Sequence, residues 1–264
     1  MILGVLGRVP AGFVLACEGM DLAPETTTHL LPVAGGRRRI YLAEKRPLGL
    51  LFWGLEFVGS DISTETAARI QDWEEKASQP LNELVNSLAR SLYERLKRIH
   101  SDGPPPFFPP IGFFMAGFEI GQDLGRDWAW DMSPLFSPPR PVRSGRSDEP
   151  HYGFNWRGQM ELWLTRLILG YDPTLLDLLR SDLGLAHERL ISIVRKVEMA
   201  VSYSGMGLEQ AMEFASFLIQ TAQGLYRLHA PRRGWKPRIE LATITPQGAH
   251  LILPKEKEEG SELR

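Results

Sequence analysis

Short, continuous apolar runs separated by turn residues open the chain. The runs at residues 2–6 and 13–17 flank Pro10 and Gly12. Continuous apolar runs bounded by turn residues are typical of buried strands, so these two runs predict a hairpin. The same pattern predicts further strands in three places, at residues 28–33, 39–43 and 48–54.

The pattern then becomes helical between residue 64 and about residue 100. In its second part apolar residues recur every three or four positions, which is typical of an amphipathic helix. Pro80 suits the first turn of that helix, where proline is tolerated. Similar reasoning predicts a strand at 111–118 with a hairpin partner at 127–136, helices at 159–169, 183–201 and 208–226, and strands at 239–244 and 250–253.

The order of these segments favours antiparallel sheets with helices packed on them. The strands come in groups joined by hairpins, and they do not alternate with helices as in a doubly wound sheet. We therefore expect an α+β fold. We expect one domain over residues 1–254, followed by a charged, disordered tail at residues 255–264.

Composition excludes several classes of function. The chain of 264 residues has a net charge of −2, which gives no field for attracting nucleic acid or an anionic membrane. Its one cysteine, Cys17, rules out an internal disulfide and suits the cytoplasm. No signal peptide and no apolar run of about 20 residues is evident. Histidine spacing and the absence of a nucleotide-binding fingerprint predict no metal and no cofactor.

Four phrases in order along the chain carry a family resemblance: "GVLGRVPAGFVLACEG", "LGLLFWGLEFVGSD", "IGFFMAGFE" and "PRIELATITPQGAHLI". In that order they resemble four parts of the proteasome-type N-terminal nucleophile (Ntn) hydrolases: the opening hairpin, the strand that enters the first long helix, a strand that ends in Ala-Gly-aromatic-acid, and the final hairpin. The resemblance implies a four-layer αββα sandwich, with two antiparallel sheets between helical layers. It also implies a homo-oligomer such as a ring, with a peptide or protein as a further partner.

In active members of that family an N-terminal threonine is the nucleophile, and the chain's own α-amine can act as its base. Carried onto this sequence, the threonine position falls at or just before Met1, whose amine is retained as a candidate base. The family's aspartate matches Glu18, and its lysine best matches His29. The phrase "NWRGQ", expected in a loop before a late helix, lacks the family's serine. The resemblance thus implies catalytic positions at Met1, Glu18 and His29 without the reactive hydroxyl.

Three functions remain open at this stage. The first is a proteasome subunit-like protein without threonine protease activity, which assembles or binds. The second is an Ntn-type amide hydrolase with an altered or processed site, in which cleavage frees Cys17 or one of residues 26–28 as a new terminus. Cys17 is also explained as a buried strand residue, and His29 as a side chain satisfied by a carboxylate. A peptide-binding or small-molecule-binding domain is a third reading.

Overall fold

The computed structural model describes most of the chain. The described residues are 3–20, 39–53, 72, 79–99, 111–132, 142–143, 151–158, 160–184, 186–194, 196, 201–229 and 237–252. The predicted strand at 28–33 and the predicted tail at 255–264 lie outside them, as does nearly all of the predicted helix ahead of Pro80.

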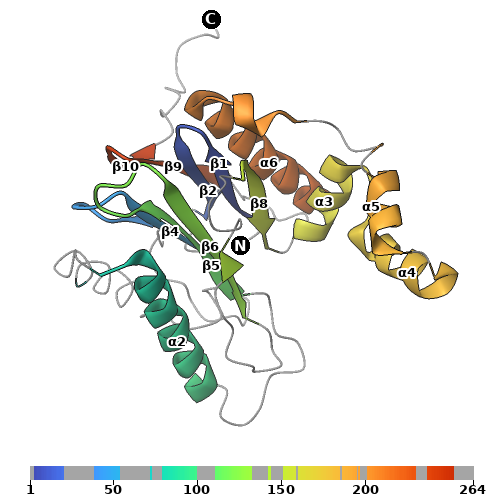
Figure 1. Cartoon of the computed structure of the whole chain (residues 1–264), viewed down its shortest axis with the longest axis horizontal. Helices are drawn as coiled ribbons and strands as arrows, with labels where there is room; N and C mark the ends of the chain where they lie inside the picture. Colours follow the sequence, from blue (N-terminus) through green and yellow to red (C-terminus); the bar gives the residue numbers. More distant parts are fainter. Residues whose placement is uncertain are drawn as a thin grey trace, which may run out of the picture.

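Two antiparallel sheets of five strands each form the centre of the molecule (Figure 1). The first sheet has the order β10-β9-β2-β1-β8, and the second has the order β3-β4-β5-β6-β7. The strands of the first sheet are β1 (Gly4–Val9), β2 (Gly12–Met20), β8 (Gly153–Arg157), β9 (Pro237–Thr245) and β10 (Gly248–Ile252). Those of the second are β3 (Ile40–Leu42), β4 (Leu48–Trp53), β5 (Ile111–Phe118), β6 (Gly125–Met132) and β7 (Val142–Arg143).

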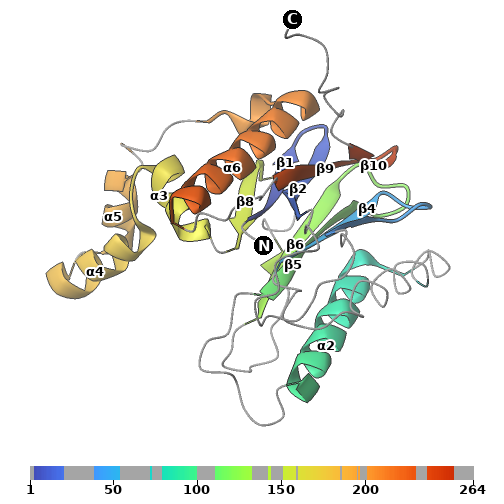
Figure 2. The same cartoon turned by 180° about the vertical axis from the view of Figure 1, so that it is seen from behind.

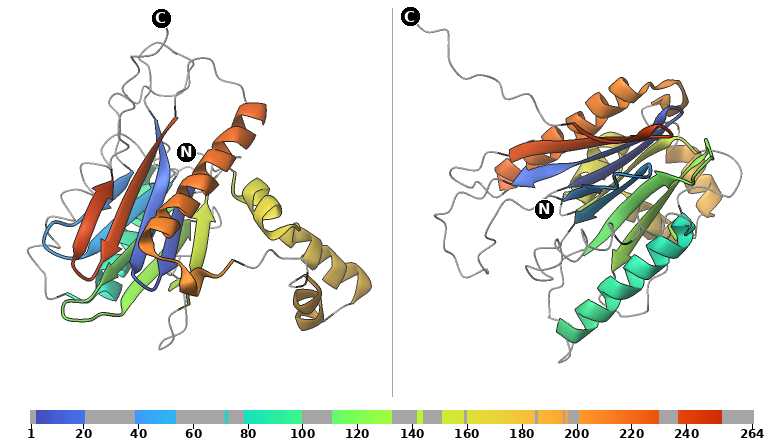
Figure 3. Two further views of the ribbon diagram at one scale, coloured as in Figure 1. Left: turned by 90° about the horizontal axis from the view of Figure 1, so that it is seen from above. Right: turned by 90° about the vertical axis from the view of Figure 1, so that its left-hand side faces the viewer.

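Helices cover the outer faces of the two sheets (Figures 2 and 3). Helix α2 lies along the second sheet, α6 lies across the first, and α4 and α5 extend beyond α3, away from both sheets. The helices are α2 (Leu81–Ile99), α3 (Glu161–Leu169), α4 (Pro173–Leu183), α5 (His187–Val194) and α6 (Leu208–His229), with a 3-10 turn at Tyr203–Gly205.

Alternation along the strands divides the apolar residues into three clusters. Along β2, Phe13, Leu15 and Cys17 belong to the cluster between the sheets. Their neighbours Val14 and Ala16 belong to the cluster beneath α6. A third cluster packs α2 against the outer face of the second sheet. Successive strand residues point to opposite faces, so each inner strand supplies two layers of the core.

The structure confirms the strands that the sequence predicted from apolar runs, within the described residues. Their described parts fall in β1 to β6, β9 and β10, and a turn at residues 246–247 joins β9 to β10. The result is a mixed α/β fold with two antiparallel sheets and, in the described residues, five α-helices. None of these helices is long and apolar enough to span a membrane.

Several elements differ from the predictions. No strand was predicted at β7, a two-residue strand at Val142–Arg143. Residues 155–157 of "NWRGQ" belong to strand β8, where the sequence predicted a loop. Only Trp156 is buried on this strand, and no apolar run marks it. The predicted helix at 183–201 was also wrong in its bounds. Asp172 accepts a hydrogen bond from Thr174 N and starts α4, Gly184 ends it in a left-handed conformation, and α5 follows.

Candidate functional site

One row of paired residues crosses the first sheet at the end where β1 begins. Gly4 is opposite Cys17 on β2 and opposite Arg157 on β8, and Cys17 is opposite Glu240 on β9. Residues directly opposite one another in a ladder share a face of the sheet. Cys17 belongs to the cluster between the sheets, so this sheet-end row faces the second sheet.

Cys17 is fully enclosed within the sheet-end row. Its Sγ lies 3.9 Å from Glu240 Oε2, which also accepts a hydrogen bond from the Arg39 backbone N–H at 3.4 Å. Burial raises the pKa of the Cys17 thiol well above its ordinary value, and the Glu240 carboxylate adds to this, while Arg39 opposes it. The thiolate is the nucleophilic form of cysteine, so the intact fold keeps Cys17 unreactive.

The pairing of β1 also bears on the idea that cleavage frees Cys17. Strand β1 lies between β2 and β8 and pairs with both. Cleavage before Cys17 would remove β1 and most of β2, and β8 would lose the strand that connects it to the sheet. A role for Cys17 as a freed nucleophile therefore conflicts with the pairing of the first sheet.

A thiol-labelling experiment tests the enclosure of Cys17. We expect the native protein to resist a maleimide reagent at neutral pH, and the urea-unfolded protein to take up one equivalent rapidly. The measurement is the mass gained with time in each state. Rapid labelling of the native protein, with circular dichroism unchanged, would show that the thiol is accessible and ionised.

Glu18 is buried, with 1% of its surface exposed, near the end of β2. Val14 and Ala16 lie in the cluster beneath α6, and alternation along β2 puts Glu18 on the same face. Glu18 thus points away from the face that carries Cys17 and the rest of the sheet-end row. Met1 and His29 lie outside the described residues, and the catalytic roles of Met1, Glu18 and His29 remain predictions.

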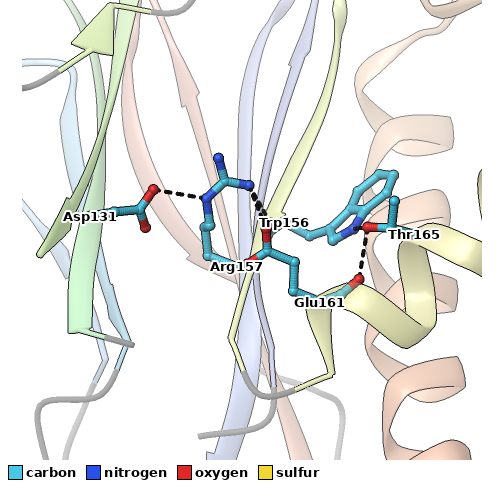
Figure 4. Close-up of polar contacts among 5 residues, drawn as sticks. All are labelled: Asp131, Trp156, Arg157, Glu161 and Thr165. Atoms are coloured by element: carbon cyan, nitrogen blue, oxygen red, sulfur yellow. Dashed lines mark hydrogen bonds and ion pairs between the residues drawn. The ribbon is translucent and has the colours of Figure 1, made fainter. Parts of the chain in front are cut away.

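At the other end of the row, Arg157 connects three elements (Figure 4). Its Nε donates to Asp131 Oδ2 on β6 at 3.0 Å, and its Nη1 donates to Glu161 Oε1 on α3 at 3.0 Å. Nη1 also donates to the Trp156 carbonyl at 2.9 Å. Arg157 therefore links β8 of the first sheet to the second sheet and to the first turn of α3.

This Arg157 network perturbs one carboxyl group. Burial raises the pKa of Glu161 above its ordinary value, and the negative charge of Asp131 acts in the same direction. Arg157 and the backbone hydrogen bond from Gly158 oppose the increase. With both carboxylates ionised the three side chains carry a net charge of −1. A carboxyl group with a raised pKa in a hollow is a candidate for proton transfer or for ligand binding.

An open hollow of about 510 Å³ lies beside this network. It is lined by Phe154, Asn155, Trp156, Arg157, Gly158, Glu161, Leu162 and Thr165. The Trp156 ring is fixed in the wall, because its Nε1 donates to Thr165 Oγ1 at 2.8 Å. Thr165 Oγ1 in turn donates to the Glu161 carbonyl at 2.7 Å. The hollow thus joins the end of β8 to the first turns of α3.

Sequence reasoning did not identify the Arg157 network. One local signal was present, since Arg157 and Glu161 are four residues apart and form an ion pair. Asp131 comes from another sheet, and only the fold brings it to Arg157. Within the described residues, no group of three histidine, cysteine, aspartate or glutamate side chains could hold a metal ion.

Comparison with known proteins gives a likeness of fold. No family model matches the sequence, and no curated protein sequence matches it. Among solved structures, the chain is similar to Anbu (ancestral beta-subunit) from Yersinia bercovieri, with a TM-score of 0.53 and 12% sequence identity. The match covers 96% of this chain and 88% of that chain. At this identity the match establishes a similar fold, and chemistry has to be argued from the residues.

Proposed function

We propose that this chain is a proteasome subunit-like protein that assembles or binds and lacks threonine protease activity. The observation that carries the proposal is the similarity of fold to Anbu over 96% of the chain. The proposal includes the finer features implied by the sequence resemblance. These are a single αββα domain over residues 1–254 and a cytoplasmic homo-oligomer, of which a ring is one form.

The chemistry of the sheet-end row supports a non-hydrolytic role. Cys17 is the one thiol of the chain, and it is buried with a raised pKa. By the sequence resemblance Glu18 matches the family's aspartate, and alternation with Val14 and Ala16 along β2 points it to the α6 face. Arg157 is the cation of the sheet-end row, and it already donates hydrogen bonds to the carboxylates of Asp131 and Glu161. None of these three side chains therefore provides an activated nucleophile.

One observation favours a second candidate, an Ntn-type amide hydrolase with an altered or processed site. Glu161, on α3, has a raised pKa and lines an open hollow. The same hollow borders β8, the strand next to β1. A carboxyl group with a raised pKa can serve as a general acid or base. In this reading Glu161 would serve as the acid or base, and a group freed by processing would serve as the nucleophile.

Sedimentation velocity combined with a peptidase assay distinguishes the two candidates. We expect the purified protein to sediment as a homo-oligomer and to leave a panel of fluorogenic peptides intact. The panel should carry acidic, basic and apolar residues before the scissile bond. A monomer that hydrolyses one of these peptides, with activity lost in Glu161→Gln, would overturn the proposal and favour the hydrolase.

A further inference from the structure

The hollow beside α3 follows the edge of a strand. Five consecutive residues, 154–158, line it, and four of them belong to β8. Successive residues of a strand point to opposite faces of a sheet, so a hollow on one face would be lined by every second residue. A hollow lined by all five residues therefore runs along the edge of β8.

That edge is open to pairing within the described part of the chain. Among the described strands, β8 is the last strand of the first sheet and pairs with β1 on its inner side alone. The outer edge of such a strand presents backbone N–H and C=O groups that can pair with another chain. An extended peptide can add to an open edge as a further strand, with its backbone supplying the hydrogen bonds.

The opposite wall of the hollow is the start of α3. Glu161 and Leu162 face the space, and Leu162 is 39% exposed. Trp163 and Leu167 continue an exposed apolar surface along the same helix, at 42% and 57%. An added strand would thus lie between β8 and a partly apolar helix, which suits a peptide with alternating apolar residues.

The charge of the Arg157 network determines which polar side chains a bound peptide would carry. Arg157 binds one oxygen of each carboxylate, Asp131 Oδ2 and Glu161 Oε1. The Glu161 carboxylate also accepts a backbone hydrogen bond from Gly158, whereas the second oxygen of Asp131 has no hydrogen-bond partner among the described residues. With its net charge of −1, the Arg157 network repels a further anion and attracts a cation. The raised pKa of Glu161 has the same physical origin, since burial and Asp131 both disfavour negative charge there.

We propose that the hollow between β8 and α3 binds an extended peptide segment, which adds to the outer edge of β8 and presents a lysine or arginine side chain to Glu161 and Asp131. The proposal goes beyond the proposed function. Its readout is binding, so it stands or falls separately from assembly and peptide hydrolysis, which sedimentation and the peptidase assay measure.

Fluorescence anisotropy with three labelled hexapeptides tests the proposal on the full chain. The first peptide alternates valine and lysine, the second replaces each lysine with glutamate, and the third is the lysine peptide methylated at alternate backbone amides. Methylation removes the N–H donors that strand addition requires and keeps the side chains. We expect the first peptide to bind and each of the others to bind at least about tenfold more weakly.

Protein variants locate the site. We expect Glu161→Gln to weaken binding of the lysine peptide about tenfold, since it removes one charged hydrogen-bond acceptor and keeps the side-chain shape. Glu209→Gln makes the same change in the exposed first turn of α6, outside the hollow, and should leave binding unchanged. Circular dichroism and the unfolding midpoint establish that both variants are folded.

Four results would overturn the proposal. They are the absence of binding by the lysine peptide, equal affinity for the lysine and glutamate peptides, full affinity of the methylated peptide, and equal weakening by the two glutamate variants. The first result would show that the hollow does not bind such a peptide, and the second that binding does not depend on charge. The third would show that the peptide does not add as a strand, and the fourth that it does not bind beside Glu161.

Discussion

Replacing Asp127 with alanine is expected to lower the free energy of unfolding by about 3–5 kcal/mol. Arg8 on β1 and Asp127 on β6 form an ion pair across the two sheets, with Nη1 and Oδ1 3.0 Å apart. Their side chains are 11% and 2% exposed, and Arg8 Nη2 also donates to the Gly125 carbonyl at 2.9 Å. Removing the carboxylate leaves the Arg8 guanidinium nearly buried without its counter-ion, which is the costly case for a buried pair.

The matched control is on the same strand. Asp131 also lies on β6 and also pairs with an arginine of the first sheet, Arg157, at 3.0 Å, but its side chain is 51% exposed. Solvent screens such a pair, so Asp131→Ala should cost less than about 1 kcal/mol. Urea unfolding followed by circular dichroism measures both variants. Equal losses in the two would show that burial does not set the contribution of these ion pairs.

Replacing Gly12 with alanine should destabilise the fold by at least about 2 kcal/mol. Gly12 begins β2 directly after the first turn, with φ at 145°, a conformation that other residues rarely adopt. A Cβ atom there would lie 2.2 Å from the Ile244 carbonyl oxygen on β9. Backbone strain and a steric clash with a paired strand therefore act together at this position.

Gly121 separates these two causes. It lies in the turn between β5 and β6 with φ at 75°, and a Cβ atom there would meet nothing within 4 Å. Gly121→Ala should carry the backbone strain alone, about 1–2 kcal/mol. Thermal and urea unfolding of both variants give the comparison. If Gly12→Ala proves no more destabilising than Gly121→Ala, then β9 does not pack against the hairpin turn as described.

Continuous apolar runs predicted most of the strands, and elements without such a run were missed. Strands β4 and β5 are buried at every position, so their apolar runs were evident. Strand β8 lies at the sheet edge with one buried residue and left no such run. The ends of helix α4 are marked by Asp172 and Pro173 at its start and by Gly184 after its last turn. Each of these residue types is also common in turns, so only the three together indicate a helix.

The candidate site could be predicted only in part for a similar reason. The family resemblance predicts catalytic positions at the start of the chain and at Glu18. The hairpin of β1 and β2 brings these two parts of the chain together. The Arg157 network joins β8, α3 and β6, and its Asp131 is 26 residues from Arg157 in the sequence. Such contacts depend on how the two sheets face each other, which residue spacing does not encode.

We propose that this chain combines a fold similar to that of Anbu with the absence of N-terminal nucleophile chemistry. Mass spectrometry of the intact protein after incubation with a peptide β-lactone tests this proposal, because a β-lactone acylates an activated hydroxyl or thiol and adds its own mass. We expect the mass of the folded protein to stay unchanged. A stoichiometric adduct that maps to the first residue of the mature chain would overturn the proposal.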